Sequence, residues 1–160
     1  MTIRYWALAI AAVIAVIAVE NAVATQGGDR IATVTRVIDG DTFEIAGGAR
    51  VRVRNFDTPE LRNYECADER YLARAARDAA RRILKNRKVT LVITDQDRYR
   101  RLVADVIVHE GSKRYDFVDR MVSGGHGARW LYGYEPQPTW CGEGPSLERR
   151  VIDMISGLFN

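Results

Sequence analysis

Residues 42–56 read TFEIAGGARVRVRNF and predict two antiparallel strands joined by a tight turn. Apolar side chains alternate with polar ones on both sides of the turn, at Phe43, Ile45, Val51 and Val53. This period of two is typical of strands with one buried face. The Gly47-Gly48 pair favours a hairpin turn, because glycine readily adopts positive φ. We expect one strand over 42–45 and another over 49–56.

Similar patterns continue on both sides of this hairpin. Three more strands are expected over 31–38, 89–93 and 102–108. Apolar residues recur with helical spacing over 66–86, 116–123 and 145–159. Three strands, a helix, two strands and then short helices are typical of the OB-type barrel. The expected fold class is α+β, a five-stranded OB-type β-barrel with about three helices.

The N-terminal segment, residues 1–24, has the composition of a signal peptide. Arg4 precedes a long apolar run, and Ala22-Val23-Ala24 supplies the small residues that a signal peptidase accepts. We expect cleavage after this segment, a linker over 25–29 and one domain over 30–160, periplasmic or secreted. The alternative is an uncleaved membrane anchor, because the apolar run is only slightly shorter than the roughly 20 residues that span a bilayer.

The charge of the chain does not by itself indicate a partner. The formal net charge is +3, from 24 basic and 21 acidic residues, and the lysines are limited to Lys85, Lys88 and Lys113. Arginine, which makes up the rest, holds phosphate in a planar fork and keeps its charge. A GC-rich genome would produce the same enrichment. Both explanations remain open.

Two short acidic turns each follow a strand-like run. They read Val37-Ile-Asp-Gly-Asp-Thr42 and Asp57-Thr-Pro-Glu60. Carboxylate oxygens at the ends of neighbouring strands suit a small divalent cation such as Ca²⁺. Asp39 is expected to be a turn residue that bonds its own backbone.

Arginines accompany these carboxylates. Arg52 lies in the strand that leads into the second turn, and the run Asp97-Arg-Tyr-Arg-Arg101 precedes the last strand. An attack on a phosphodiester builds negative charge on the phosphate oxygens, which arginines and a cation can stabilise. The combination indicates phosphodiester chemistry.

These three motifs, in this order and at this spacing, resemble the staphylococcal nuclease (thermonuclease) family over residues 31–135. The resemblance implies that Asp41 and Asp57 are carboxylate ligands of Ca²⁺, with Thr58 adding its backbone carbonyl. It implies that Glu60 acts as, or helps to position, the general base for the attacking water.

The same resemblance implies which residues bind the substrate. Arg52 and Arg101 would hold the scissile phosphate, Tyr99 would contact a nucleotide phosphate, and Arg98 beside it would also bind substrate. Two further residues, Tyr132 and Tyr134, are similar to a tyrosine pair that contacts the bound nucleotide, although the match needs one inserted residue. The family hydrolyses DNA and RNA and leaves 3′-phosphates. A monomer without a membrane partner after signal cleavage is expected.

One departure from the family pattern lies next to a proposed catalytic residue. The family usually has glycine where Arg100 stands. The turn must therefore adopt a different backbone geometry or tolerate a bulky side chain, and either outcome affects Arg101.

The two cysteines, Cys66 and Cys141, are predicted to form a disulfide. An even number of cysteines in an exported chain favours a bond over free thiols. The alternative is two unpaired thiols.

The leading functional hypothesis is an exported Ca²⁺-dependent nuclease with little sequence preference. The alternative is a catalytically silent OB-fold module that binds nucleic acid without cutting it. Loss of a proposed catalytic residue would mark that alternative. Loss of Asp41 would mark it as well, and Asp41, Arg52, Glu60 and Arg101 are all present.

Overall fold

The computed structural model describes residues 29–142. Its strands are β1 (Asp29–Val37), β2 (Thr42–Ile45), β3 (Arg50–Val53), β4 (Phe56–Asp57), β5 (Lys88–Gln96), β6 (Leu102–Glu110), β7 (Lys113–Asp116) and β8 (Ala128–Arg129). Its helices are α2 (Ala67–Leu84) and α3 (Phe117–Ser123). Neither of these helices is long and apolar enough to cross a membrane.

Five of the strands close into a barrel. The main sheet has the order β3-β2-β1-β5-β6-β7, and β3 also pairs in parallel with β6. In that pairing Val51 lies opposite Leu102, and Val53 lies opposite Ala104. The pairing closes the ring β3-β2-β1-β5-β6, while β7 continues from β6 outside it. The expected α+β class and the five-stranded OB-type barrel are confirmed.

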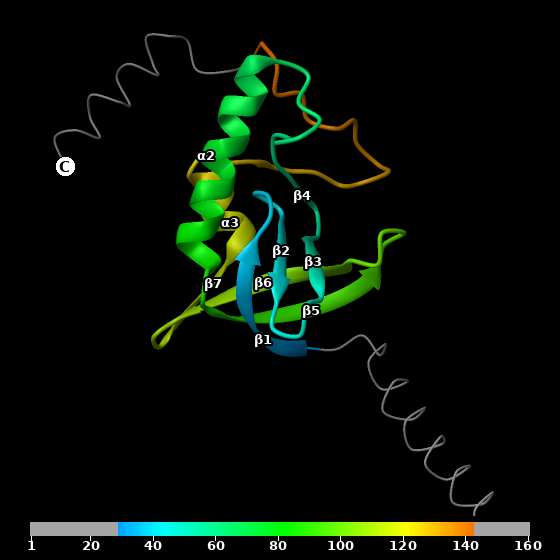
Figure 1. The fold of residues 1–160 in the computed structure, drawn as a ribbon. Helices are drawn as coiled ribbons and strands as arrows, with labels where there is room; N and C mark the ends of the chain where they lie inside the picture. The colour runs from blue at the N-terminus through cyan, green and yellow to red at the C-terminus, as the bar shows by residue number, and fades with distance from the viewer. Residues whose placement is uncertain (1–28, 143–160) are drawn as a thin grey trace, which may run out of the picture.

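Strand β1 belongs to both sides of the barrel because it bends. Its first half pairs with β5 over Asp29–Thr33, and its second half pairs with β2 from Val34 to Val37. The register with β2 shifts between Val34 and Arg36. Such an irregularity lets a strand turn from one partner to another. Figure 1 shows β1 curving around the base of the barrel.

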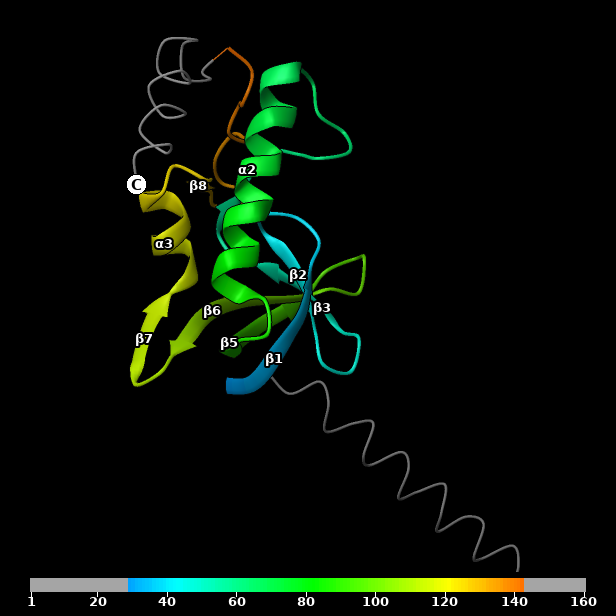
Figure 2. The same cartoon turned by 60° about the vertical axis from the view of Figure 1, so that its left-hand side comes forward.

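The core lies inside the barrel and beneath α2. Alternate residues of each barrel strand point inward, including Phe43, Ile45, Val51, Val53, Val89, Leu91, Ala104, Val106 and Val108. Helix α2 contributes small residues and one leucine, Ala76, Ala79, Ala80 and Leu84, to the same cluster. Figures 1 and 2 show α2 and α3 side by side against the barrel. The arginine-rich face of α2 is left to solvent.

The strand expected over 49–56 is interrupted in the structure. Strand β3 ends at Val53, and Asn55 adopts a φ of 50°, in the left-handed region. The chain then continues as β4, which leaves the barrel and pairs with β8, Asp57 lying opposite Ala128. The alternation of arginine and valine predicts a longer strand. The turn at Asn55 ends that strand early, so that Asp57 lies on β4, outside the barrel sheet.

The remaining differences lie at the ends of elements. The helices expected over 66–86 and 116–123 are present as α2 and α3. The strands expected over 89–93 and 102–108 are longer, as β5 and β6, and the short strands β7 and β8 were not expected. The third expected helix, over 145–159, and the signal peptide over 1–24 lie outside the described residues.

Candidate functional site

The two acidic turns lie next to each other and share one arginine. Asp41 lies just before β2 and Asp57 ends β4, and the two residues are 6% and 1% exposed. Arg52 on β3 forms an ion pair with Asp41, and its Nη2 atom lies 3.4 Å from Oδ1 of Asp57. The backbone N–H of Val53 donates to the carbonyl of Asp41 at 2.9 Å, which ties the first turn to the same strand. The pairing of β2 with β3, which places Thr42 opposite Arg52, therefore brings Asp41 to the guanidinium that Asp57 also contacts.

Two hydroxyl groups fix the orientation of the Asp41 carboxylate. Thr42 Oγ1 donates to Oδ1 at 2.8 Å, and Thr58 Oγ1 donates to Oδ2 at 3.2 Å. Thr58 is 2% exposed and packs against Gly40, where an added Cβ would lie 2.8 Å from Cγ2 of Thr58. The glycine between the two aspartates is thus required for the close approach of the second turn to the first.

Glu60 lies at the start of a loop that a buried carboxylate holds in place. The backbone N–H of Glu60 donates to Oε1 of Glu69 at 3.1 Å, and the N–H of Glu65 donates to Oε2 at 2.6 Å. Glu69 itself is 5% exposed and lies in the first turn of α2. The loop therefore has a fixed backbone at Glu60, while the Glu60 residue is exposed to solvent.

Negative charge accumulates around these turns. Burial raises the pKa of Asp57, and the charge of Asp41 adds to this effect. Partial burial also raises the pKa of Glu60, and Asp41, Asp39 and Asp57 raise it further. Asp39 belongs to the same group of interacting carboxylates, because burial and then the charge of Asp41 raise its pKa. A cation bound among these carboxylates would relieve their mutual repulsion.

The donor atoms fit a hard divalent cation held by a small number of protein oxygens. Across residues 29–142, no group of three or more His, Cys, Asp or Glu side chains is arranged to hold a metal on its own. Asp41 and Asp57 supply two buried carboxylates, and the backbone carbonyl of Thr58 follows directly in the chain. Ca²⁺ and Mg²⁺ accept sets of carboxylate, carbonyl and water oxygens of this kind.

The turn before β6 presents a second arginine to the same region. Asp97 Oδ1 accepts the backbone N–H groups of Tyr99 at 2.9 Å and Arg101 at 3.0 Å, and Oδ2 accepts Nε of Arg101 at 2.7 Å. Nη1 of Arg101 lies 3.5 Å from Oγ1 of Thr42, the hydroxyl that donates to Asp41. Arg101 is therefore connected through Thr42 to the carboxylate that Arg52 contacts.

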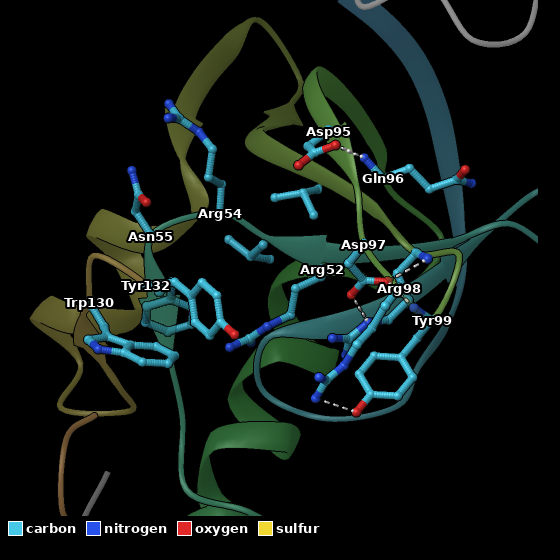
Figure 3. A pocket seen from close by; sticks show the side chains of 14 residues that line it. Arg52, Arg54, Asn55, Asp95, Gln96, Asp97, Arg98, Tyr99, Trp130 and Tyr132 are labelled. Atoms are coloured by element: carbon cyan, nitrogen blue, oxygen red, sulfur yellow. Dashed lines mark hydrogen bonds and ion pairs between the residues drawn. The ribbon is translucent and has the colours of Figure 1, made fainter. Parts of the chain in front are cut away.

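A pocket of about 510 Å³ opens beside these two arginines. Its lining includes charged, amide and aromatic side chains, among them Arg52, Arg54, Asn55, Asp95, Gln96, Asp97, Arg98, Tyr99, Arg101, Trp130 and Tyr132. Figure 3 shows Arg52 between Tyr132 on one side and Arg98 and Tyr99 on the other. The size suits a nucleotide unit, and the guanidinium groups suit its phosphates.

Tyr99 lies under two of the arginines that line the pocket. The guanidinium carbons of Arg98 and Arg101 lie 4.9 Å and 5.3 Å from the centre of its ring. Nη2 of Arg98 also donates to the Tyr99 hydroxyl at 2.9 Å. Tyr99 is 63% exposed, so it is a surface residue with two guanidinium groups over its ring, not part of the core.

The aromatic residues across the pocket differ in part from the expected pair. Tyr132 lines the pocket together with Trp130, and their rings meet edge to face at 5.3 Å. Tyr134 is 91% exposed and is not among the lining residues. The sequence reasoning missed Trp130, although its spacing of two from Tyr132 indicated a shared face on an extended chain.

The two cysteines are bonded to each other in the structure. Cys141 joins Cys66, which is the N-cap of α2, across 75 residues of sequence. The segment that leads to Cys141 crosses Asp57, because Trp140 Nε1 donates to Oδ2 of Asp57 at 3.2 Å. Gln137 Nε2 lies 3.5 Å from Oδ1 of the same carboxylate. Neither contact was expected, and the adjacency of Trp140 to Cys141 was the one signal available.

Comparison with known proteins supports a nuclease. Residues 50–140 match a family described as "Staphylococcal nuclease homologue". Two proteins, from Escherichia coli O157:H7 and from Escherichia coli, are similar to this chain and are each described as "Uncharacterized endonuclease". Each is 29% identical over 131 residues, which cover 79% of this chain and 75% of the relative. The region matched by the family contains Arg52, Asp57 and Arg101.

Proposed function

The chain belongs to the staphylococcal nuclease family, and from that premise we propose that this nuclease uses Ca²⁺ to cut DNA and RNA with little sequence preference, leaving 3′-phosphates. The observation that carries the proposal is the position of Arg52. Its guanidinium contacts two buried carboxylates and also lines a pocket of nucleotide size.

Arg52 and Arg101 are proposed to bind the scissile phosphate. Both line the pocket, and the chain of contacts through Thr42 and Asp41 keeps them in one region. A phosphodiester under attack gains negative charge on its equatorial oxygens. Two guanidinium groups with prearranged donors stabilise that charge more than they stabilise the bound substrate, which is the condition for a faster reaction.

Glu60 is proposed to accept the proton of the attacking water. The water oxygen forms a bond to phosphorus, the bond to the 5′-oxygen breaks, and that oxygen takes up a proton to leave as a hydroxyl. Partial burial and the neighbouring carboxylates raise the pKa of Glu60, which makes its carboxylate a better proton acceptor than an ordinary glutamate. The bond from its backbone N–H to Glu69 fixes the backbone from which this side chain extends.

Asp41, Asp57 and the backbone carbonyl of Thr58 are proposed to hold the cation. When bound, Ca²⁺ supplies positive charge at the phosphate and helps to orient the attacking water. The hydroxyls of Thr42 and Thr58 keep the Asp41 carboxylate in one orientation before substrate arrives. Such preorganisation lowers the cost of assembling the site.

The kinds of contact that the pocket provides support the proposed low sequence preference. Tyr99 and Arg98 present an aromatic ring and a guanidinium group, and Trp130 and Tyr132 present further rings. Every nucleobase has a face that can stack on such groups, so stacking and phosphate contacts discriminate little between sequences. Tyr134, which lies outside the lining, is proposed to contact substrate only beyond the pocket.

The enzyme is proposed to act in the periplasm or outside the cell. The signal-peptide composition of residues 1–24 supports this location. The bond between Cys66 and Cys141 supports it independently, because disulfides persist in oxidising compartments. Mass measurement of the protein recovered from the periplasm and medium tests cleavage of the first 24 residues.

Digestion of a single-stranded DNA and a matched RNA tests the proposal. We expect cleavage of both with added Ca²⁺ and loss of cleavage with a chelator, restored by excess Ca²⁺. Mass spectrometry of the products should find 3′-phosphates and 5′-hydroxyls. Equal cleavage with and without the chelator would contradict the cation role. Binding without cleavage under all conditions would instead support a silent binding module.

A further inference from the structure

The carboxylate of Asp57 is held by three side chains, and two of them come from one irregular segment. Arg52 Nη2 lies 3.4 Å from Oδ1, and Gln137 Nε2 lies 3.5 Å from the same oxygen. Trp140 Nε1 donates to Oδ2 at 3.2 Å, the shortest of the three contacts. The barrel strand β3 holds Asp57 from one side, and a segment after β8 holds it from the other.

Polar and covalent bonds tie this segment to the site. Among the described residues, the side-chain hydrogen bonds of Gln137 and Trp140 run to Asp57, and the covalent bond of Cys141 runs to Cys66. The chain between β8 and Cys141 contains neither helix nor strand. Gln137 is exposed, so packing does little to hold it. The disulfide one residue beyond Trp140 is therefore a covalent restraint on where the indole lies.

We propose that Trp140 is a positioning residue for Asp57, and that the Cys66–Cys141 disulfide keeps its indole N–H on the carboxylate. Gln137 assists from the same segment. This inference rests on the proposed cation role of Asp57. The covalent bond anchors the segment at Cys66, the N-cap residue of α2.

The physical reason lies in what a metal-binding carboxylate needs. A carboxylate oxygen has two lone pairs, so it can accept a hydrogen bond and still bind a cation. Groups that donate to a metal ligand fix its orientation, and their loss typically weakens metal binding about 10-fold to 100-fold. Because Asp57 is 1% exposed, little water is available to replace the indole N–H.

Calorimetric titration with Ca²⁺, without nucleic acid, tests the role of Trp140. We expect Trp140→Phe, which keeps an aromatic ring but removes the N–H, to bind Ca²⁺ about 10-fold to 100-fold more weakly. The matched control is Trp130→Phe, which removes an indole N–H that donates to the carbonyl of Glu135 at 2.9 Å. The control should keep wild-type Ca²⁺ affinity. Equal affinity of Trp140→Phe and wild type would overturn the inference.

A double-mutant cycle tests whether the disulfide acts through Trp140. The variant Cys66→Ser with Cys141→Ser breaks the bond, and serine retains an N-cap acceptor where Sγ of Cys66 accepts the N–H of Glu69 at 3.4 Å. We expect it to lose Ca²⁺ affinity to a similar degree as Trp140→Phe. Adding Trp140→Phe to it should then cause little further loss, because both changes remove one interaction. Fully additive losses would contradict the proposed link.

Two further measurements separate positioning from folding. Circular dichroism should find each variant folded, and raising Ca²⁺ should restore the nuclease activity of Trp140→Phe, which a merely structural defect would not allow. If Trp140→Phe does not fold, Gln137→Leu at the exposed position should still weaken Ca²⁺ binding several-fold, and unchanged affinity there would count against the inference. A wild-type protein that binds no Ca²⁺ would overturn the proposed cation role itself, and is distinguishable from these outcomes.

Discussion

Asp97 holds Arg101 with both of its carboxylate oxygens. Oδ1 accepts the backbone N–H of Arg101 at 3.0 Å, and Oδ2 accepts its Nε at 2.7 Å. The Asp97 side chain thus fixes both the backbone just before β6 and the direction in which the Arg101 side chain points. Arg101 then reaches Oγ1 of Thr42 at 3.5 Å, at the start of β2. The acid is a positioning residue for the arginine proposed to bind phosphate.

Replacement of Asp97 by asparagine should impair catalysis more than folding. The amide side chain would retain an oxygen for the backbone N–H groups, but the charge-assisted bond to Nε of Arg101 would be lost. Bonds to charged groups contribute about 1.5–3 kcal/mol, so we expect kcat/KM to fall roughly 10-fold to 100-fold. Steady-state kinetics on a labelled oligonucleotide measures this. Asp95→Asn, two residues earlier near the exposed C-terminal end of β5, serves as the charge-matched comparison for stability.

The stability effect of the same variant should depend on pH. Desolvation raises the pKa of Asp97, but its bonds with Arg101 and Tyr99 outweigh this, and the net result is a lowered pKa. A lowered pKa stabilises the fold above the ordinary aspartate value and loses that effect as pH falls through the folded-state value. Asp97→Asn should therefore be less stable than wild type at neutral pH, and the difference should shrink below about pH 3.9. A difference independent of pH would contradict this.

Substitution of Arg100 by glycine should stabilise the protein. Arg100 has a φ of 62°, the left-handed region that glycine adopts freely and arginine does not. The turn thus keeps the backbone that the family's usual glycine favours, and it tolerates the bulky side chain. We expect Arg100→Gly to raise the free energy of unfolding by about 1 kcal/mol. Urea denaturation measures it.

Asn86→Gly is the control for that gain. Asn86 also has a positive φ, 61°, but asparagine tolerates this region better than arginine. Its substitution should therefore stabilise less than Arg100→Gly. An equal gain in the free energy of unfolding at both positions would show that the arginine side chain adds no strain beyond that of asparagine at a positive φ.

Replacement of Glu60 by alanine should abolish most activity and leave the fold intact. The residue is exposed, and the bond that holds the loop uses its backbone N–H, which alanine retains. Loss of a general base typically lowers turnover about 100-fold to 10,000-fold. Single-turnover cleavage measures this, with Glu65→Ala in the same loop as the control that keeps activity. Near-normal turnover of the alanine variant would remove Glu60 as the base.

The barrel could be predicted from sequence because its strands carry their own pattern. Alternation in 42–45 and at Val51 and Val53 indicates one inward face, and Gly47 indicates the turn between them. The pairing of β4 with β8 has no such signal, since each strand has two residues. It depends on Gly127, where an added Cβ would lie 2.5 Å from the Phe56 ring. A contact of this kind is fixed by tertiary structure, not by local propensity.

The same distinction separates the expected site residues from the missed ones. The acidic and arginine residues lie in short motifs next to strands, so their proximity follows from the pairing of β3 with β2 and with β6. Trp130, Gln137 and Trp140 reach the site from a segment without regular structure. Their positions depend on the path of the chain from β8 to Cys141, which periodicity does not encode. Tyr132, in the same segment, was expected only through the family resemblance and not from periodicity.

Gly40→Ala should damage the cation site through a steric conflict with Thr58. The added Cβ would lie 2.8 Å from Cγ2 and 2.9 Å from Oγ1 of Thr58, whose hydroxyl donates to Asp41. Because Thr58 is buried, relief requires one turn to move from the other, and such overpacking costs about 1–3 kcal/mol. We expect a loss of that size in urea denaturation, together with weaker Ca²⁺ binding.

A second substitution tests whether this contact is the cause. Thr58→Ser removes Cγ2 but keeps the hydroxyl that donates to Asp41, so it relieves the nearest part of the conflict. The double variant, Gly40→Ala with Thr58→Ser, should therefore recover part of the lost stability and part of the lost Ca²⁺ affinity. Thr58→Ser alone, in the presence of Gly40, should bind Ca²⁺ nearly as wild type does. If the effects of the two substitutions on stability and on Ca²⁺ affinity simply added, the close approach of the two acidic turns would not require glycine at position 40.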